Sequence, residues 1–324
     1  MSEGIQNAIN SAGPQADNIA GLWWLMFAVC SIVFVLVMIA LLLAIRNRTR
    51  EPQSAIAPML ELDQEQERRR RNVVLTAVVL TVIILFVFTI ASFSAGRSMS
   101  ADMASKNGLT IEVTGFQWWW QFRYLDVDAS NIFTTANEIH IPVGVPVTFN
   151  LRANDVIHSF WVPNLAGKKD LIPGKANTIW LQANKPGVYR GQCAEYCGMQ
   201  HARMAFWIVA EPQEQFNAWR QNQTQTSVTP TTDSQKRGQQ VFLSSTCVMC
   251  HTINGTPAAS NIGPNLTHVA SRNTIGAATL ANTREHLYQW VKDSQSVKPG
   301  NRMPQHNLAE ADFQALLDYL QSLK

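Results

Sequence analysis

Two long uncharged stretches near the N-terminus limit what this chain can fold into more than any other feature. Residues 19–45 and 72–96 contain no Asp, Glu, Lys or Arg. Each stretch exceeds the roughly 20 residues that an α-helix needs to cross a bilayer. A helix in a water-soluble domain is seldom apolar on every side over this length, because one side usually faces water. The sequence therefore predicts a membrane-anchored protein with a transmembrane helix hairpin over residues 19–96.

The charges beside these stretches predict which ends face the cytoplasm. Residues 46–71 carry many arginines, including a run at 68–71, whereas residues 1–18 contain neither Lys nor Arg. Because short arginine-rich loops stay in the cytoplasm, we expect 46–71 to be a cytoplasmic loop. Residues 1–18 and everything after Arg97 are then extracytoplasmic. The alternative interpretation of the arginine run is a solvated helix end.

The rest of the chain changes character twice. Residues 97–220 contain many short alternating segments separated by Gly and Pro, which predict an all-β sandwich or Greek-key barrel. Residues 221–233 form a polar Gln/Thr/Pro tract and are predicted to be a flexible linker. Residues 234–324 show helical periodicity and predict an all-α domain. The net charge of +3 is too small to indicate a nucleic-acid partner.

A cluster of soft metal ligands lies near the end of the β-rich part. Cys193, Cys197, His201 and Met204 fall within a short segment, and His158 stands upstream at a strand edge. Thiolate, imidazole and thioether together are typical of copper sites, and methionine is a poor ligand for zinc. One cysteine suffices for a single copper, so the second thiolate indicates a bridge between two copper ions. The alternative is a disulfide between Cys193 and Cys197.

A second motif lies in the helical part. Cys247, Cys250 and His251 form the C-x-x-C-H pattern that attaches c-type haem through two thioethers and a proximal histidine. Met303 is the only methionine after this motif, so we expect it to be the second axial ligand. The rivals for that position are His268, His286 and His306.

These motifs resemble the cytochrome c oxidase subunit II family over residues 19–212 and a class I cytochrome c over residues 234–324. The resemblance implies a cupredoxin domain with a binuclear copper centre, CuA. It implies that Glu195 offers its backbone carbonyl to copper and its carboxylate to a magnesium ion beside the catalytic subunit. It also implies that Pro264 orients His251. The implied copper ligands are His158, Cys193, Glu195, Cys197, His201 and Met204.

An aromatic run, GFQWWWQFRY, begins at Gly115. Core packing or a membrane-interface belt explains at least one of its tryptophans. The resemblance places Trp118 where electrons reach the copper pair. Arg123 stands where the family often has an acidic residue, so an acidic docking face for a separate basic cytochrome is not expected here.

The resemblance implies the electron-transfer subunit of a terminal cytochrome c oxidase. Electrons would pass from an external donor to the fused haem, then to CuA, then to a haem–copper catalytic subunit that reduces oxygen and pumps protons. Subunits I and III, the lipid bilayer and the bacterial inner membrane are the implied partners and location. The alternatives are a subunit of a CuA-containing nitric oxide reductase and a membrane-anchored electron shuttle. A quinol-oxidase subunit should lack the copper ligands.

Two further positions concern the catalytic subunit. Family members often have a glutamate where this chain has Asn72, so Glu67 or another subunit would serve the proton channel. The segment KKDLIPGK, with Asp170 and Lys175, resembles the family's stretch that faces the catalytic subunit. Exposed loop charge is the alternative for that segment.

Overall fold

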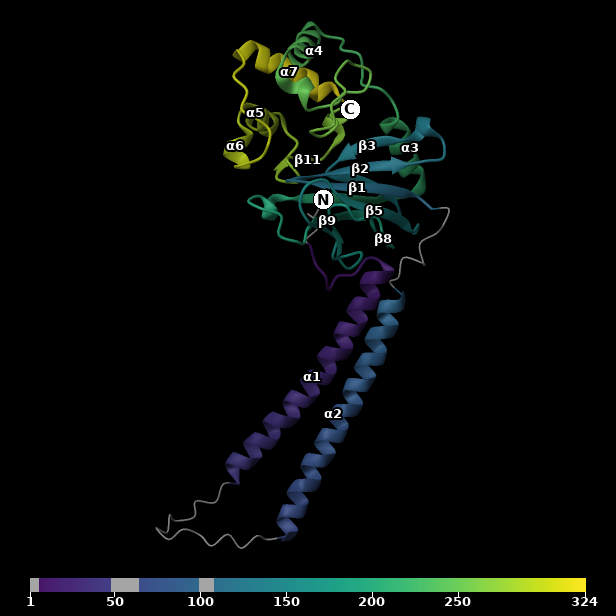
Figure 1. Ribbon diagram of the computed structural model, residues 1–324, viewed down its shortest axis with the longest axis vertical. Helices are drawn as coiled ribbons and strands as arrows, with labels where there is room; N and C mark the ends of the chain where they lie inside the picture. The colour runs from purple at the N-terminus through teal and green to yellow at the C-terminus, as the bar shows by residue number, and fades with distance from the viewer. Residues whose placement is uncertain (1–5, 48–63, 99–107) are drawn as a thin grey trace, which may run out of the picture. The chain divides into compact units, whose positions relative to one another are not determined.

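The computed structural model describes residues 6–47, 64–98 and 108–324 (Figure 1). The described residues up to Asp17 and from 108 onward form one compact unit, and those from Asn18 to Ser98 form a second. Residues 99–107 of the predicted β-rich domain and most of the predicted loop 46–71 lie outside the described residues.

The described part of the second unit lies in two long helices, α1 (Pro14–Arg46) and α2 (Gln64–Ser98), and only the first turn of α1 belongs to the first unit. Both are long and apolar enough to cross a membrane, which suggests membrane anchoring. The arginine run lies inside α2, so the predicted loop over 46–71 is too long at its C-terminal end. Arginine and glutamate favour helix, and Arg69 pairs with Glu65 one turn away at 3.0 Å. The run is therefore a helix end, as the alternative interpretation held.

Residues 108–212 form a β-sandwich of two five-stranded sheets, which confirms the predicted fold of this part. We call it the β-sandwich domain (Figure 1). Strand β1 pairs in parallel with β5, and β4 pairs in parallel with β10, while the other neighbours are antiparallel. The first sheet has the order β3 (Phe133–Ala136), β2 (Trp119–Leu125), β1 (Thr110–Phe116), β5 (Val147–Ala153), β8 (Asn177–Leu181). The second has the order β4 (Glu138–Pro142), β10 (Ala205–Glu211), β9 (Gly187–Cys193), β6 (His158–Trp161), β7 (Lys169–Leu171).

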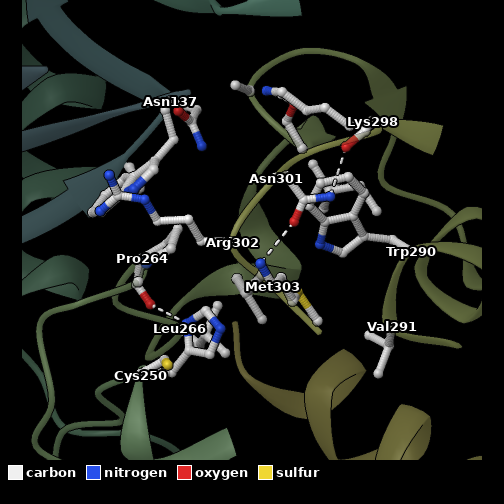
Figure 2. A pocket seen from close by; sticks show the side chains of 18 of the residues that line it. Asn137, Cys250, Pro264, Leu266, Trp290, Val291, Lys298, Asn301, Arg302 and Met303 are labelled. Atoms are coloured by element: carbon white, nitrogen blue, oxygen red, sulfur yellow. Dashed lines mark hydrogen bonds between the residues drawn. The ribbon is translucent and has the colours of Figure 1, made fainter. Parts of the chain in front are cut away.

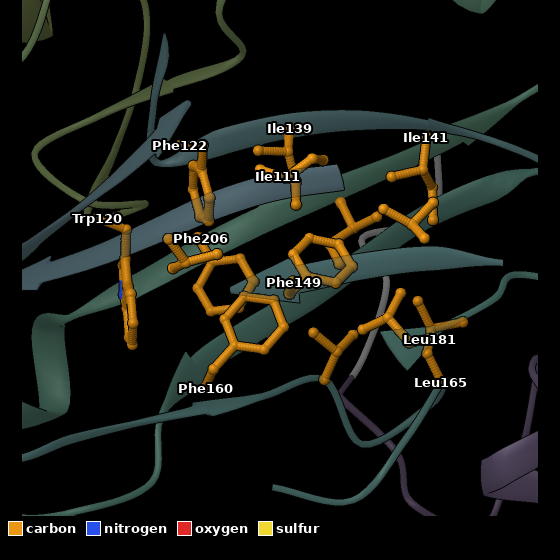
Figure 3. Close-up of a cluster of buried hydrophobic side chains, with 14 of the residues drawn as sticks. Ile111, Trp120, Phe122, Ile139, Ile141, Phe149, Phe160, Leu165, Leu181 and Phe206 are labelled. Carbon is orange, nitrogen blue, oxygen red and sulfur yellow. The ribbon is translucent and has the colours of Figure 1, made fainter. Parts of the chain in front are cut away.

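The core lies between the two sheets (Figure 3). Ile111 and Val113 are buried on one side of β1, as their alternation in the sequence predicts. From the other sheet, Phe160 and Phe206 stack with ring centroids 4.7 Å apart. Trp120 packs edge-on against Phe206 at 5.2 Å and is fully buried. This aromatic packing holds β6, β9 and β10 in place, and these strands carry the candidate metal ligands.

The aromatic run and the N-terminal residues fold in ways that the sequence did not predict. The run forms the end of β1, a turn and strand β2. The N-terminal segment, predicted only to be extracytoplasmic, pairs with the β-sandwich domain. Ala12 donates its N–H to Asn164 O at 2.7 Å, and Asn184 donates to Ala12 O at 2.7 Å. A Cβ at Gly13 would lie 2.3 Å from Gln182 O, so only glycine fits this approach.

Residues 233–324 form the C-terminal domain, which is mostly helical as predicted. Its longest helices, α4 and α7, pack against each other (Figure 1). A two-stranded ribbon, β11 (Thr274–Ile275) with β12 (Leu280–Ala281), makes the domain not entirely helical. The helices are α4 (Asp233–Ser244), α5 (Arg284–Lys292), α6 (Ser294–Val297) and α7 (Glu310–Ser322).

The connection between the two domains is shorter than the predicted linker over 221–233. Helix α3 (Gln213–Gln223) continues into the tract, and a capping box on Thr232 starts α4 at Asp233. Part of the connection is held by the C-terminal domain. Ser227 donates its N–H to Asn254 O at 3.0 Å, and a ring nitrogen of His268 lies 3.2 Å from Gln225 O.

The contact between α4 and α7 generates a stability prediction. An added Cβ at Gly238 would lie 2.0 Å from Ala315 O, so the helices must move apart to accept it. Gly238→Ala is therefore expected to destabilise the C-terminal domain by about 1–3 kcal/mol, although alanine normally favours a helix interior by about 1 kcal/mol. Calorimetry of the full chain measures this, with Gln240→Ala at an exposed position of α4 as the control. A stabilised Gly238→Ala protein would contradict the close approach.

Candidate functional site

The loop that joins β9 to β10 carries the thiolate cluster. Strand β9 ends at Cys193 and β10 begins at Ala205, and the two strands pair antiparallel. Cys193 donates its N–H to Met204 O at 2.9 Å, so the two ends of the loop lie side by side. Strand β6 lies next to β9 and begins at His158. This topology brings residues from distant parts of the sequence to one edge of the sandwich.

The predicted ligands converge at this edge. His158, Cys193 and Cys197 are buried, and their potential ligand atoms all lie within 4.8 Å of one another. The two sulfurs are 3.8 Å apart, far beyond the roughly 2.05 Å of a disulfide, and both cysteines are free. The remaining separations are His158 Nδ1–Cys193 Sγ 3.9 Å, His201 Nδ1–Cys197 Sγ 3.6 Å, Met204 Sδ–Cys197 Sγ 3.7 Å and Glu195 O–Cys193 Sγ 3.1 Å.

Asp155 orients His158, and the sequence analysis did not identify it. Its carboxylate lies 2.8 Å from His158 Nε2, which leaves Nδ1 directed at the sulfur of Cys193. Burial alone would raise the pKa of Asp155, but hydrogen bonds from His158, Gln117 and Val156 hold it below its usual value. A carboxylate on the far nitrogen is the common way to orient a ligand histidine. The D-x-x-H spacing was the available signal.

The electrostatics of the cluster suit a bound cation. The hydrogen bond between the two sulfurs lowers the pKa of Cys193 to about 4 and raises the pKa of Cys197. Burial by itself would lower the pKa of His158, but its bonds to Asp155 and Cys193 raise it. The metal-free cluster therefore keeps protons that a metal ion must displace.

Trp118 lies directly against this loop. Its indole Nε1 donates to Cys197 O at 2.9 Å, and Gln117 Nε2 donates to the same oxygen at 2.8 Å. The approach requires a glycine at Gly198, where φ is +109° and an added Cβ would lie 3.1 Å from the Trp118 ring. The neighbouring Trp120 is a core residue instead, so the packing explanation holds for that tryptophan.

The C-terminal domain contributes to a cavity of about 520 Å³, which holds the second motif. Cys247, Cys250, His251 and Met303 all line it, and Figure 2 shows Cys250 and Met303 at its wall. His251 Nδ1 lies 2.7 Å from Pro264 O, as the resemblance implied, so its other nitrogen is available to a ligand. The four residues and the volume fit a covalently attached haem.

The three histidines that are alternatives to Met303 as the second axial ligand have different surroundings. Both ring nitrogens of His268 contact backbone carbonyls, those of Lys324 and Gln225. His286 does not line the cavity and contacts Ala281 O. His306 does line the cavity, so it is the rival that remains.

Met303 is held by the loop that carries it. Its N–H donates to Asn301 Oδ1 at 2.8 Å, and its carbonyl accepts from Ser294 Oγ at 2.8 Å. Figure 2 shows the Asn301 bond beside the cavity. These bonds fix the backbone at a position where the thioether side chain lines the cavity.

The same cavity extends to the β-sandwich domain. Trp118, Trp119, Phe116 and Gln117 line it together with the residues of the C-x-x-C-H motif. Trp118 therefore contacts both the cavity and the loop that carries Cys197. The sequence places these two motifs far apart, and no local pattern indicates that they share a wall.

The carboxylate of Glu195 pairs with a lysine. It lies 3.6 Å from Lys168 Nζ, and the same ammonium lies 3.1 Å from Asp170 Oδ1. Two carboxylates thus converge on one cationic group at a partly exposed surface. Lys168 and Asp170 are thus the charged residues of the KKDLIPGK segment that lie near Glu195, whereas Lys175 is exposed in the turn that follows.

The protons held by the thiolate cluster generate a pH prediction. Because Cys197 and His158 have raised pKa values, both must lose protons to bind a metal. Copper binding to the metal-free protein is therefore expected to strengthen between about pH 5 and about pH 8 and to release protons. Calorimetric titrations in buffers of different ionisation enthalpy measure both effects. Asp155→Asn removes the anion that raises the pKa of His158, so its pH dependence should be weaker.

Binding that is independent of pH, with no proton released, would show that the cluster is already deprotonated. An Asp155→Asn protein with an unchanged pH profile would show that the carboxylate does not control His158.

Comparison with known proteins agrees with both the thiolate cluster and the cavity of the C-x-x-C-H motif. A family model described as the periplasmic domain of cytochrome c oxidase subunit II matches residues 109–211, and a cytochrome c model matches residues 235–324. Together these two domains suggest copper and haem c as cofactors. The periplasmic character of the first domain suggests that it lies outside the cytoplasm.

Several curated proteins and solved structures are similar. Cytochrome c oxidase subunit 2 of Alkalihalophilus pseudofirmus is 43% identical over 219 residues, which are 67% of this chain and 62% of that protein. The protein of the same name from Bacillus sp. strain PS3 is 33% identical over 249 residues, 74% of this chain and 68% of that protein. The crystal structure of the periplasmic domain of subunit II of cytochrome oxidase from Bradyrhizobium japonicum is 33% identical. It covers 37% of this chain and 96% of its own, with a TM-score of 0.35.

The chain thus spans about two thirds of the length of these two relatives. The chain belongs to the cytochrome c oxidase subunit II family, and it carries a cytochrome c domain at its C-terminal end.

Proposed function

We propose that this chain is the electron-transfer subunit of a terminal cytochrome c oxidase, and that it carries its own electron donor. One observation supports this most directly: Trp118 lines the cavity of the C-x-x-C-H motif and also donates a hydrogen bond to the loop of Cys197. Electrons would pass from an external donor to the haem, then to the copper site beside Trp118, then to a catalytic partner.

The thiolate cluster would hold the binuclear CuA centre. Two free cysteines with sulfurs 3.8 Å apart could both bridge a pair of metal ions, and a site for one copper would need only one of them. His158 and His201 direct Nδ1 at different sulfurs, so each can serve one metal. Met204 and the carbonyl of Glu195 complete the set. A bound copper pair supplies one-electron exchange, and the sandwich core limits movement of its ligands.

The cavity would hold the haem. Cys247, Cys250, His251 and Met303 all line the cavity. The two cysteines would form the thioethers, His251 would be the proximal ligand, and Met303 would be the distal ligand. A bound haem supplies the one-electron store, and Met/His ligation gives it a raised potential. Pro264 keeps the proton on His251 Nδ1, which leaves the other nitrogen free for iron.

The partners follow from the family. The oxygen chemistry and the proton pumping would belong to a haem–copper subunit I, with subunit III beside it, in the inner membrane of a bacterium. Helices α1 and α2 would cross the bilayer as a hairpin, with both redox domains outside. Glu195 and the segment with Asp170 would face subunit I, and the Glu195 carboxylate, which pairs with Lys168 in this structure, would hold a magnesium ion there.

Two other functions use the same chain differently. In a CuA-containing nitric oxide reductase, the catalytic partner would carry a different active-site metal. A membrane-anchored shuttle would have no permanent catalytic partner. The family membership favours the oxidase, and the complete ligand set argues against a quinol-oxidase subunit.

The metal content tests the proposal. Protein purified from membranes is expected to contain two copper ions and one covalent haem c per chain, together with a subunit that carries haem a. Elemental analysis, absorption spectra and electron paramagnetic resonance measure these quantities. One zinc ion per chain, or no haem, would contradict the proposal. Absence of a haem a partner would support the shuttle, and a partner with non-haem iron would support the nitric oxide reductase.

A pair of variants tests the distal haem ligand. Met303→Ala is expected to lower the haem potential and to change the absorption spectrum, because the thioether leaves the iron. His306→Ala removes the other candidate that lines the cavity and is expected to leave both unchanged. If the effects were reversed between the two variants, His306 would be the ligand.

A further inference from the structure

A lysine of the C-terminal domain is buried against the β-sandwich domain. Lys298 is only 2% exposed. Its ammonium donates to Trp118 O at 2.7 Å, to Arg203 O at 2.7 Å and to Gly276 O at 3.2 Å. Two of these three carbonyls belong to the β-sandwich domain. One side chain therefore ties the two redox domains together.

The chemistry of this contact indicates that Lys298 sets the relative position of the two domains more than it stabilises the fold. An ammonium has three donors, and three backbone carbonyls satisfy them. Burial lowers the pKa of Lys298 to about 7, which reflects the cost of taking its charge out of water. An apolar side chain of the same length would avoid that cost, but it would leave the carbonyls unpaired.

The carbonyls that Lys298 contacts belong to residues beside the proposed electron path. Trp118 lies against the Cys197 loop, and Arg203 stands between the predicted ligands His201 and Met204. On the other side, the loop that begins at Lys298 ends at Met303, and Figure 2 shows both beside the cavity. The contact thus joins one ligand-bearing loop to the other.

Residues of the β-sandwich domain also donate hydrogen bonds to the C-terminal domain beside Lys298. The guanidinium of Arg203 donates to Val297 O, and Gln200 Nε2 donates to Pro299 O at 2.7 Å. Arg302 lies 3.8 Å from the carboxylate of Asp155, which orients His158. Each domain therefore donates to backbone carbonyls or carboxylates of the other over a short stretch of loop.

We propose that Lys298 is a positioning residue for electron transfer within the chain. It holds the loop that carries Met303 against the loop that carries Cys197. We call this contact the lock, and it would keep the haem at a fixed distance from the copper site next to Trp118. The proposal rests on the proposed function for its consequence, since only a haem and a copper site make the separation matter. The lock is a contact between the two domains, so the docking of these domains can be measured without measuring electron transfer.

Two backbone amides at the interface report the lock independently. Ala205 donates its N–H to Ala277 O at 3.3 Å, and Asn273 donates its N–H to Glu138 Oε2 at 2.9 Å. Both bonds cross between the domains, so both amides are protected from hydrogen exchange only while the domains are docked. Neither amide contacts Lys298.

The experiment compares Lys298→Met with the wild type in the intact, metal-loaded complex. Hydrogen exchange at Ala205 and Asn273 is expected to become at least about tenfold faster, because unpaired buried carbonyls weaken docking by at least that factor. After rapid reduction of the haem, the rate of electron transfer to copper is expected to fall at least about twofold, because the two ligand-bearing loops are no longer held at one separation. The haem and copper spectra should not change, since no ligand is altered.

Two further variants keep the test decisive. Lys236→Met removes an exposed lysine from α4 of the same domain, and it should change neither exchange nor rate. If Lys298→Met fails to bind its cofactors, Lys298→Gln keeps two donors on a shorter side chain and should show a smaller effect of the same kind.

Unchanged exchange at both amides would overturn the proposed lock. Faster exchange with an unchanged transfer rate would overturn the positioning role, whereas missing copper or haem in the wild type would overturn the proposed function instead.

Discussion

The antiparallel pairing of β9 with β10 is the constraint on which the rest of the site depends. It holds Cys193 and Met204 next to each other through the bond from Cys193 N–H to Met204 O. The intervening loop must then fold over the end of the sandwich, and the spacing of its residues turns two thiols, an imidazole and a thioether inward. The aromatic core under these strands, with Phe160 stacked on Phe206, keeps that geometry fixed.

The second constraint is the wall that the two redox domains share. Trp118 donates to the loop that carries Cys197 with its side chain and accepts from Lys298 with its backbone carbonyl. It also lines the cavity that contains the haem motif. A tether alone would raise the local concentration of the donor domain, but contacts of this kind also select its orientation. The short connection between α3 and α4, held at Ser227, is consistent with a donor that stays docked.

The sequence predicted the features that depend on local chemistry. The apolar stretches predicted the helices, alternation predicted strands such as β1, and the ligand spacings predicted which side chains converge. It did not predict what depends on distant residues. Asp155 became recognisable only when its carboxylate was seen beside His158, and the buried contacts of Lys298 arise from folding of two separate domains. The linker and loop boundaries were wrong where Gln, Glu and Arg extend a helix into a polar segment.

If the proposed function holds, electrons pass from haem to copper within one chain. This transfer is measured by the rate of copper reduction after rapid photoreduction of the haem in the purified complex, followed over a range of protein concentrations. Transfer within the chain gives a rate that is independent of concentration and unaffected by added soluble cytochrome c. A rate that rises in proportion to the concentration, or that requires the added cytochrome, would contradict it.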